Sequence, residues 1–357
     1  MPQTYGIKYV GSKLKIIPYI ISLLSELNDV KSILDGFSGT TRVSQALAQL
    51  GYHVTSNDIS VWSEIVANCF LKSTMTDSFY QEILDHLNSL TGYDGWYTEN
   101  YGINLIHRKR PFKSKNTRKL DAIRDEIECL NLSWIDKSVI LTSLIFALDK
   151  VDNTLGHYVA YLSKCSPRSN KDLFLEVPKR FSTNHINHNV VKDDIFKTVS
   201  NNSYDFVYYD PPYGSNNDKM PPSRVRYAAY YHIWTTIIKH DKPKIFGKAN
   251  RRIDTKDVVA SSIFEEFRKA NDGNFIALNA LDELIQKTNS KYILLSYSSG
   301  GRATKKELKS IINKSGRLLK AIEVNYKKNV MANMRWTNDW INSDSKYLEY
   351  LFLMEKN

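Results

Sequence analysis

A strand, a glycine-rich turn, a helix and a second strand follow one another near the start of this chain, and this series constrains the fold most. Residues 32–34 form a short apolar run typical of a buried strand, and residues 43–50 carry apolar side chains at helical spacing. Gly51 stands where a helix C-cap is expected, and residues 52–56 predict the second strand. The series is the opening of a doubly wound α/β sheet.

Similar patterns recur later, but two long stretches interrupt them. Strands are predicted at 189–191, 205–209 and 292–297, with two more near 319–326 and 347–354, and a helix is predicted at 304–312. The interruptions are 73–186 and 214–289. We therefore expect one discontinuous sheet domain, 1–72 and 187–357, in which 73–186 is an inserted region and 214–290 a secondary insertion.

The first insertion has recognisable parts of its own. Residues 92–102 are rich in glycine, tyrosine and tryptophan, and we expect them to form an ordered loop. A helix with one apolar face is predicted at 118–130. Residues 135–148 are nearly apolar throughout, which predicts a helix buried on all sides.

The most specific motif is Asp210-Pro211-Pro212-Tyr213, directly after the apolar strand Phe206-Val207-Tyr208-Tyr209. Proline cannot donate to a sheet ladder, so the two prolines end the strand and stiffen the chain. Asp210 is thereby placed at the carboxyl end of a strand, where open α/β sheets bind ligands. An ordinary strand-to-loop turn is the alternative interpretation.

Acidic and glycine residues mark the ends of three other predicted strands. Asp35-Gly36-Phe37-Ser38-Gly39-Thr40 follows the first strand, and its glycines allow the backbone to turn tightly and approach a ligand. It is neither a P-loop nor the dinucleotide G-x-G-x-x-G pattern. Asp58, followed by Ile59, ends the second strand, where an acid commonly holds ribose hydroxyls. Asp194 ends the strand at 189–191 and could accept from a nucleoside amino group, with Asp193 as the competing candidate.

A basic segment, Lys8-Tyr9-Val10-Gly11-Ser12-Lys13, precedes the first helix. By itself it is only a basic helix start. The Lys13 ammonium could pair with a carboxylate, and Tyr9 could cover an apolar edge of a ligand.

Composition narrows the class of partner. The 357 residues include 49 Lys and Arg against 38 Asp and Glu, so the formal net charge of +11 favours a polyanion. Three widely spaced cysteines and eight histidines give neither a disulfide framework nor a metal-ligand pattern. No apolar run is long enough to span a membrane and no signal sequence is evident, so we expect a cytoplasmic protein.

These motifs occur in the order seen in Dam-like N6-adenine DNA methyltransferases, which the chain resembles over about residues 5–72 and 187–214. The likeness is greatest to bacterial and phage enzymes of restriction systems. It implies a Rossmann-like class I S-adenosylmethionine-dependent methyltransferase sheet, with 73–186 as the target-recognition region. One departure is Thr40-Thr41, where family members often have a further glycine.

The resemblance assigns roles to the motif residues. It implies catalysis by Asp210, Pro211, Pro212 and Tyr213. It implies S-adenosylmethionine binding by Tyr9, Lys13, Asp35, Gly36, Phe37, Ser38, Gly39, Thr40 and Asp58, to which Ile59 and Asp194 are added by position. The chemistry suits these residue types, because the amino group of adenine is a poor nucleophile whose lone pair is delocalised. Asp210 and the carbonyl of Pro211 would orient that amine toward the sulfonium methyl, and Tyr213 would stack on an extruded base.

Two stretches are candidates for contact with double-stranded DNA. A basic run without an intervening acid lies beside Trp96, Tyr97 and Tyr101, and it suits phosphate contacts unless it is a solvated loop. Its candidate residues are Arg108, Lys109, Arg110, Lys113, Lys115 and Arg118, with Lys119 next to them. The second stretch either contacts DNA or packs over the active site, and it contains Lys219, Arg224, Arg226, Tyr227, Tyr230, Tyr231, His232, Lys248, Arg251 and Arg252.

Other functions remain open at this point. Cytosine-N4 methylation uses the same strategy, but a serine in place of Asp210 would favour it. RNA or protein-glutamine methylation would suit an asparagine there. A catalytically silent DNA-binding subunit is the alternative from another class, and the intact Asp210 and glycine-rich turn disfavour it. A cognate restriction endonuclease is a possible partner.

Overall fold

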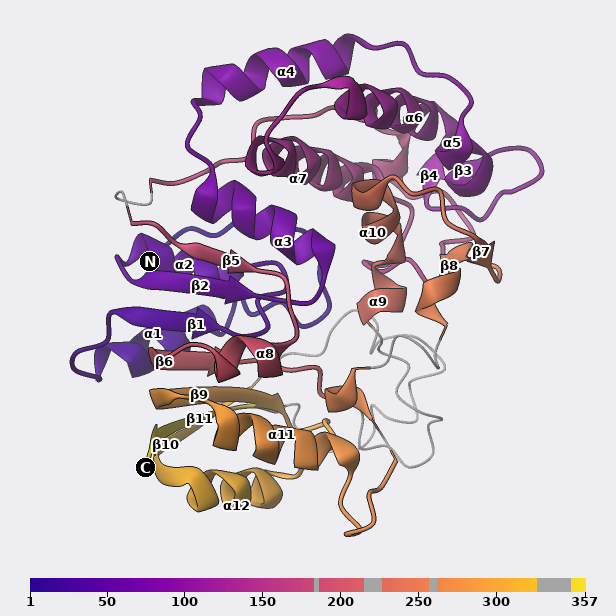
Figure 1. Cartoon of the computed structure of the whole chain (residues 1–357). Helices are drawn as coiled ribbons and strands as arrows, with labels where there is room; N and C mark the ends of the chain where they lie inside the picture. Colours follow the sequence, from indigo (N-terminus) through magenta and orange to yellow (C-terminus); the bar gives the residue numbers. More distant parts are fainter. Residues whose placement is uncertain (183–185, 215–226, 257–261, 267, 326–347) are drawn as a thin grey trace.

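The computed structural model describes residues 1–182, 186–214, 227–256, 262–266, 268–325 and 348–357. In these residues a seven-stranded sheet has the order β10-β11-β9-β6-β1-β2-β5, and only β11 runs antiparallel to its neighbours (Figure 1). The strands are β1 (Ser32–Asp35), β2 (His53–Asn57), β5 (Asn189–Val191), β6 (Tyr204–Tyr209), β9 (Ser290–Ser298), β10 (Gly316–Asn325) and β11 (Leu348–Lys356). All the predicted strands are confirmed, and so is the Rossmann-like class of fold.

Both faces of the sheet are covered by helices, because successive side chains of its strands point to opposite sides. Leu34, Val207 and Ile293 face one layer, formed by α8 (Ile195–Ser200), α11 (Ile276–Lys287) and α12 (Lys305–Ser315). Their sequence neighbours Ile33 and Phe206 face the other layer, which contains α1 (Ile17–Ser25) and α2 (Arg42–Gln49).

A helical body stands at the β5 end of the sheet (Figure 1). Its hydrophobic core joins α3 (Val61–Ala67), α4 (Asp77–Ser89), α6 (Ser114–Cys129), α7 (Trp134–Val151) and α10 (His232–Lys239). The predicted helix at 135–148 is confirmed as α7, which is buried nearly all round. Because Trp234 and Ile237 of α10 pack in the same core as Leu144 of α7, the two interrupting stretches share one hydrophobic core.

The prediction that residues 92–102 form a loop is wrong, because they contain the helix α5 (Trp96–Tyr101). The buried carboxylate of Asp121 on α6 accepts hydrogen bonds from the backbone N–H groups of Tyr97 at 2.8 Å and Thr98 at 2.9 Å. Asp121 therefore accepts hydrogen bonds from N–H groups in the first turn of α5 that would otherwise lack an acceptor, although it lies on a different helix. Tyr97 and Tyr101 are fully buried, so they belong to the core rather than to a DNA-facing loop.

Several short elements complete the described structure. The π-helical turn Asn68–Lys72 follows α3, and α9 is Tyr227–Tyr230. Two small pairs of strands are β3 (Gly102–Ile103) with β4 (Phe112–Lys113), and β7 (Ile245–Phe246) with β8 (Arg251–Arg252). The 3-10 turns are Pro167–Asn170, Ile253–Thr255 and Ile263–Glu265. Within the described ranges, no helix is long and apolar enough to cross a membrane.

Candidate active site

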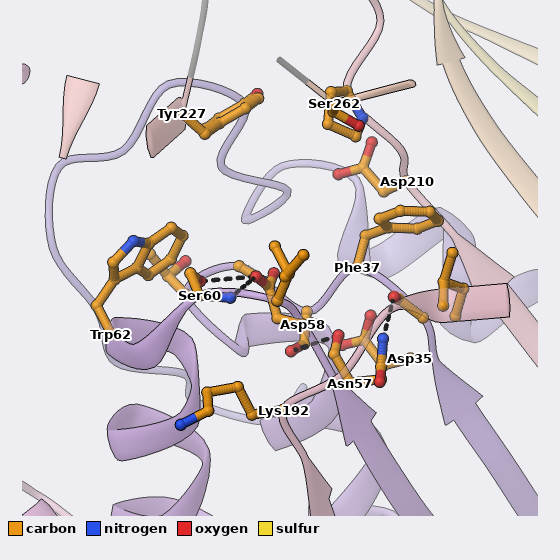
Figure 2. Close-up of a pocket in the computed structure, with 18 of the residues that line it drawn as sticks. Asp35, Phe37, Asn57, Asp58, Ser60, Trp62, Lys192, Asp210, Tyr227 and Ser262 are labelled. Atoms are coloured by element: carbon orange, nitrogen blue, oxygen red, sulfur yellow. Dashed lines mark hydrogen bonds between the residues drawn. The ribbon is translucent and has the colours of Figure 1, made fainter. Parts of the chain in front are cut away.

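A cavity of about 700 Å³ opens at the carboxyl edge of the parallel strands. It lies where the chain order reverses between β1 and β6, which is the usual ligand position in open α/β sheets. The structure brings all the predicted cofactor residues to its lining: Tyr9, Lys13, Asp35, Gly36, Phe37, Ser38, Gly39, Thr40, Asp58, Ile59 and Asp194. Asp210 and Pro212 line the same cavity, and Figure 2 shows Asp35, Asp58 and Asp210 around it.

The glycine-rich turn lies between β1 and α2, and its two glycines are required for different steric reasons. Gly39 has a φ of +51°, and its N–H donates to Asp58 Oδ2 at 2.9 Å. A Cβ on Gly36 would lie 2.7 Å from the Tyr209 ring, so Gly36 serves packing. Thr41, at the departure from the family pattern, has a φ of +60°, a conformation that favours glycine.

Two carboxylates lie at one end of the cavity, the buried Asp35 and the half-buried Asp58. Asp35 Oδ2 accepts from the backbone and hydroxyl of Ser44 at 3.0 and 2.6 Å, while its buried Oδ1 has no partner among the described residues. Burial raises the pKa of Asp35 to about 7. Asp58 Oδ1 accepts from the backbone and hydroxyl of Ser60 at 2.9 and 2.6 Å. Burial raises the pKa of Asp58 although these hydrogen bonds act against it.

The two candidates that follow β5 both line the cavity. Asp194 caps α8, because its side chain accepts from the Phe196 N–H at 2.8 Å. Asp193 accepts from the Asp194 N–H at 2.8 Å. One oxygen of each acid is therefore engaged with backbone.

At the other end, Asp210 belongs to a group of charges. Its Oδ1 lies 2.9 Å from Lys13 Nζ and accepts from the Tyr213 hydroxyl. Burial and the charge of Glu349 raise the pKa of Asp210, Lys13 lowers it, and the resulting pKa is about 6. The Tyr213 ring packs beside Tyr297, with 4.9 Å between centroids. Pro211 and Tyr213 follow in the same loop but do not line the cavity.

Sequence analysis missed several residues of the site. Trp62 and Phe264 line the cavity, and the Phe37 ring packs edge-on against that of Phe264, with 5.2 Å between centroids. Figure 2 shows Trp62 and Phe37 at the cavity. Glu349, on the last strand, contacts Lys13 and Tyr213. The only signal for Glu349 is a charged residue within the apolar run Leu348-Glu349-Tyr350-Leu351-Phe352.

The residues of the predicted basic run differ in the contacts that they make. Arg118 forms a two-pronged pair with Asp94 at 2.7 and 3.0 Å, and Lys115 pairs with Asp172 at 2.6 Å. Lys119 donates to the carbonyls of Asn88 and Leu90, and Lys113 lies on β4. Arg110 donates to the Lys248 carbonyl at 3.2 Å, which joins the β3–β4 loop to the β7–β8 hairpin.

Arg108 and Lys109 are exposed in the β3–β4 loop and have no ion-pair partner among the described residues. The loop also exposes Leu105 and Ile106, at 91% and 84%. It projects on the side toward which the carboxyl ends of the parallel strands point (Figure 1).

The second candidate stretch is mostly interior. Tyr231 and His232 are fully buried, and Tyr230 is nearly so. Arg252 is buried in ion pairs with Asp241 and Asp254. These residues therefore fit the packing alternative. Lys219, Arg224 and Arg226 lie outside the described residues.

Fold and site together define a class: an open α/β sheet with carboxylates and a glycine-rich turn around one cavity, the architecture of class I methyltransferases. The family described as D12 class N6 adenine-specific DNA methyltransferase matches residues 9–311. The chain belongs to this family and is a DNA methyltransferase specific for adenine. That membership decides against cytosine-N4, RNA and protein methylation.

Three relatives come from restriction-modification systems. The type II methyltransferase M.NlaIII of Neisseria lactamica is 26% identical, over 98% of this chain and 99% of the relative. M.FokI of Planomicrobium okeanokoites is 26% identical over 98% of this chain. The modification methylase StsI of Streptococcus sanguinis is 29% identical over 85% of this chain. The chain spans about half the length of the latter two, 53% and 46%.

Proposed function

We propose that the cavity binds S-adenosylmethionine and that Asp210 directs transfer of its methyl group to the N6 of an adenine extruded from duplex DNA. The single observation that carries the proposal is that Asp210 faces the same cavity as the glycine-rich turn and Asp58. Membership of the family identifies the reaction. The position of Asp210 at the cavity supports the cavity as the place where this reaction occurs.

The residues present fit the cofactor. The buried Asp35 Oδ1 has no partner within the described ranges and lies in the cavity wall, where it can accept from a polar ligand. Asp58 stands at the end of β2, where an acid accepts from ribose hydroxyls. Ile59 is 75% exposed at the cavity, and together with Phe37 it offers apolar surface to an adenine ring. Asp35, Asp58 and Asp210 also favour a cationic ligand.

S-adenosylmethionine supplies a methyl group on a positively charged sulfur. Asp210 accepts a hydrogen bond from the adenine amine, and the carbonyl of Pro211 accepts a second. These bonds direct the nitrogen lone pair and stabilise the positive charge that develops on nitrogen. The stiff Pro-Pro segment holds both acceptors in place.

For DNA we propose the β3–β4 loop as one contact. Arg108 and Lys109 would meet phosphates, while Leu105 and Ile106 would contact base edges or sugars in a groove. Its exposed cations, its exposed apolar tip and its position on the side of the strand ends support this. A cognate restriction endonuclease is the proposed biological partner, on the ground of the names of the relatives.

The test combines cofactor binding with mapping of modified bases in DNA from a host that expresses the protein. S-adenosylmethionine should raise the melting temperature, since a ligand that binds only the folded state adds stability by mass action. Wild type should leave N6-methyladenine at one sequence context. A folded Asp210→Ala variant should keep the thermal shift and leave no methylation. Near-normal methylation by that variant would disprove the mechanism, and absence of a thermal shift in wild type would disprove the cofactor site.

A further inference from the structure

A second carboxylate stands behind Asp210, and none of the recognised motifs contains it. Glu349 on β11 is 6% exposed. Its Oε1 accepts from Lys13 Nζ at 2.8 Å and from the Ser296 hydroxyl at 2.6 Å, and the Tyr213 hydroxyl lies 2.6 Å away. One oxygen therefore accepts from the N-terminal segment and from β9, and it lies against the hydroxyl of the catalytic loop that donates to Asp210.

Lys13 links this carboxylate to Asp210. Its ammonium lies 2.8 Å from Glu349 Oε1 and 2.9 Å from Asp210 Oδ1. Burial acts to lower the pKa of Lys13, but the two carboxylates raise it above its ordinary value. Lys13 therefore stays charged between them. Without Glu349 the buried ammonium would have a carboxylate on one side only.

The contacts of Asp210 leave one of its oxygens for substrate. Both Lys13 and the Tyr213 hydroxyl contact Oδ1, and Oδ2 makes no hydrogen bond among the described residues. Figure 2 shows the Asp210 side chain beside the cavity. Because Glu349 holds both groups that contact Oδ1, it controls the direction in which Oδ2 points.

We propose that Glu349 is a positioning residue for methyl transfer, which holds Lys13 and the Tyr213 hydroxyl against Oδ1 of Asp210 so that Oδ2 is presented to the adenine amine. The inference rests on the proposed function of Asp210. Ser296 belongs to the same arrangement, because its hydroxyl fixes Glu349 from the side of β9.

The experiment compares Glu349→Ala and Glu349→Gln with wild type in steady-state methylation of duplex DNA. Glu349→Ala should lower kcat about ten- to hundredfold while KM for S-adenosylmethionine changes little, because a misplaced reacting group affects the chemical step. Glu349→Gln should lose less, since its amide oxygen can still accept from Lys13. The matched control is Glu355→Ala on the same strand, where Glu355 pairs with the exposed Arg317, and its kcat should equal that of wild type.

The pH profile separates positioning from mere structural support. The groups that act on Asp210 are Lys13 and Glu349, with Tyr9, Asp35, Tyr208, Tyr213 and Tyr227 around them. Glu349 raises the pKa of Asp210. Removing its charge in Glu349→Gln should therefore move the acid limb of kcat to lower pH. A limb that stays at the wild-type pH would overturn the link between the two carboxylates.

A double-mutant cycle gives a further check. The double variant Glu349→Ala with Tyr213→Phe should lose less kcat than the product of the two single losses. The reason is that each substitution removes the contact between Glu349 and the Tyr213 hydroxyl. Multiplicative losses, or a folded Glu349→Ala protein with wild-type kcat, would overturn the proposal. If Glu349→Ala does not fold, Glu349→Gln and Ser296→Ala carry the test. An inactive Asp210→Ala beside a normal Glu349→Ala refutes this inference alone, whereas an active Asp210→Ala refutes the proposed function.

Discussion

Asp210 shows how neighbours set the acidity of a single side chain. Burial and the charge of Glu349 raise its pKa, Lys13 lowers the pKa, and the resulting pKa is about 6. In the proposed mechanism Asp210 acts as the ionised carboxylate, which is a stronger hydrogen-bond acceptor for the adenine amine than the neutral acid. This ionised form predominates above the pKa and disappears as the pH falls through it.

We accordingly predict that kcat at saturating cofactor falls as the pH drops below about 6. The measurement is a pH–rate profile over the pH range in which the protein stays folded. Circular dichroism at each pH checks that it is folded. The cofactor must be saturating because Asp35, with a pKa raised to about 7, lies in the proposed cofactor cavity, where its titration would affect KM rather than kcat. A flat kcat profile through this range would contradict the assignment of Asp210 as the hydrogen-bond acceptor.

The elements of the helical body depend on polar contacts between helices. Asp121 on α6 is nearly fully buried, and besides the N–H groups of Tyr97 and Thr98 it accepts from the Thr98 hydroxyl at 2.7 Å. The side chain thus serves as the N-terminal cap of α5, although it lies more than twenty positions further along the chain.

We predict that Asp121→Ala lowers the free energy of unfolding by about 2–4 kcal/mol, because several buried donors lose their acceptor. Urea unfolding followed by fluorescence measures it. Asp94→Ala is the matched control in the same region, since the ion pair of Asp94 with Arg118 is exposed, and it should leave the midpoint unchanged. Equal midpoints for the two variants would show that Asp121 does not hold α5.

At the scale of the whole molecule, the net charge of +11 does not identify the DNA-binding face, because many cations are paired internally. Lys115 and Arg118 are paired with acids. Arg108 and Lys109, on the projecting β3–β4 loop, have no such pairs among the described residues.

We predict that Arg108→Gln with Lys109→Gln weakens binding to all duplexes and reduces the slope of log affinity against log salt by about two, since two fewer counterions are released. The methylated sequence should stay the same. Fluorescence anisotropy over a salt series measures the slope. Lys306→Gln with Lys309→Gln on α12 removes the same charge from the other end of the molecule, and an equal change in that control would rule out a local contact.

Sequence choice is predicted to lie mainly in residues 73–186, because duplex DNA needs a groove-reading element that a cofactor sheet does not provide. Exchanging this segment for that of a relative should change the methylated sequence, as read by modified-base sequencing. Since α10 shares the hydrophobic core of this segment, the exchange should include the residues of α10 that pack there. An active chimera that keeps the original target would move recognition to residues after Tyr213.

Local patterns in the sequence determined the sheet, the glycine-rich turn and Asp210, because side-chain periodicity and proline act over a few residues. They also indicated the class of enzyme, since its motifs are short and continuous. Tertiary structure alone decided which charges meet. Glu349 reaches Tyr213 across 136 positions, and Asp121 turns an expected loop into a helix. Such contacts leave no local period, because the low-polarity interior stabilises them only after distant segments have packed together.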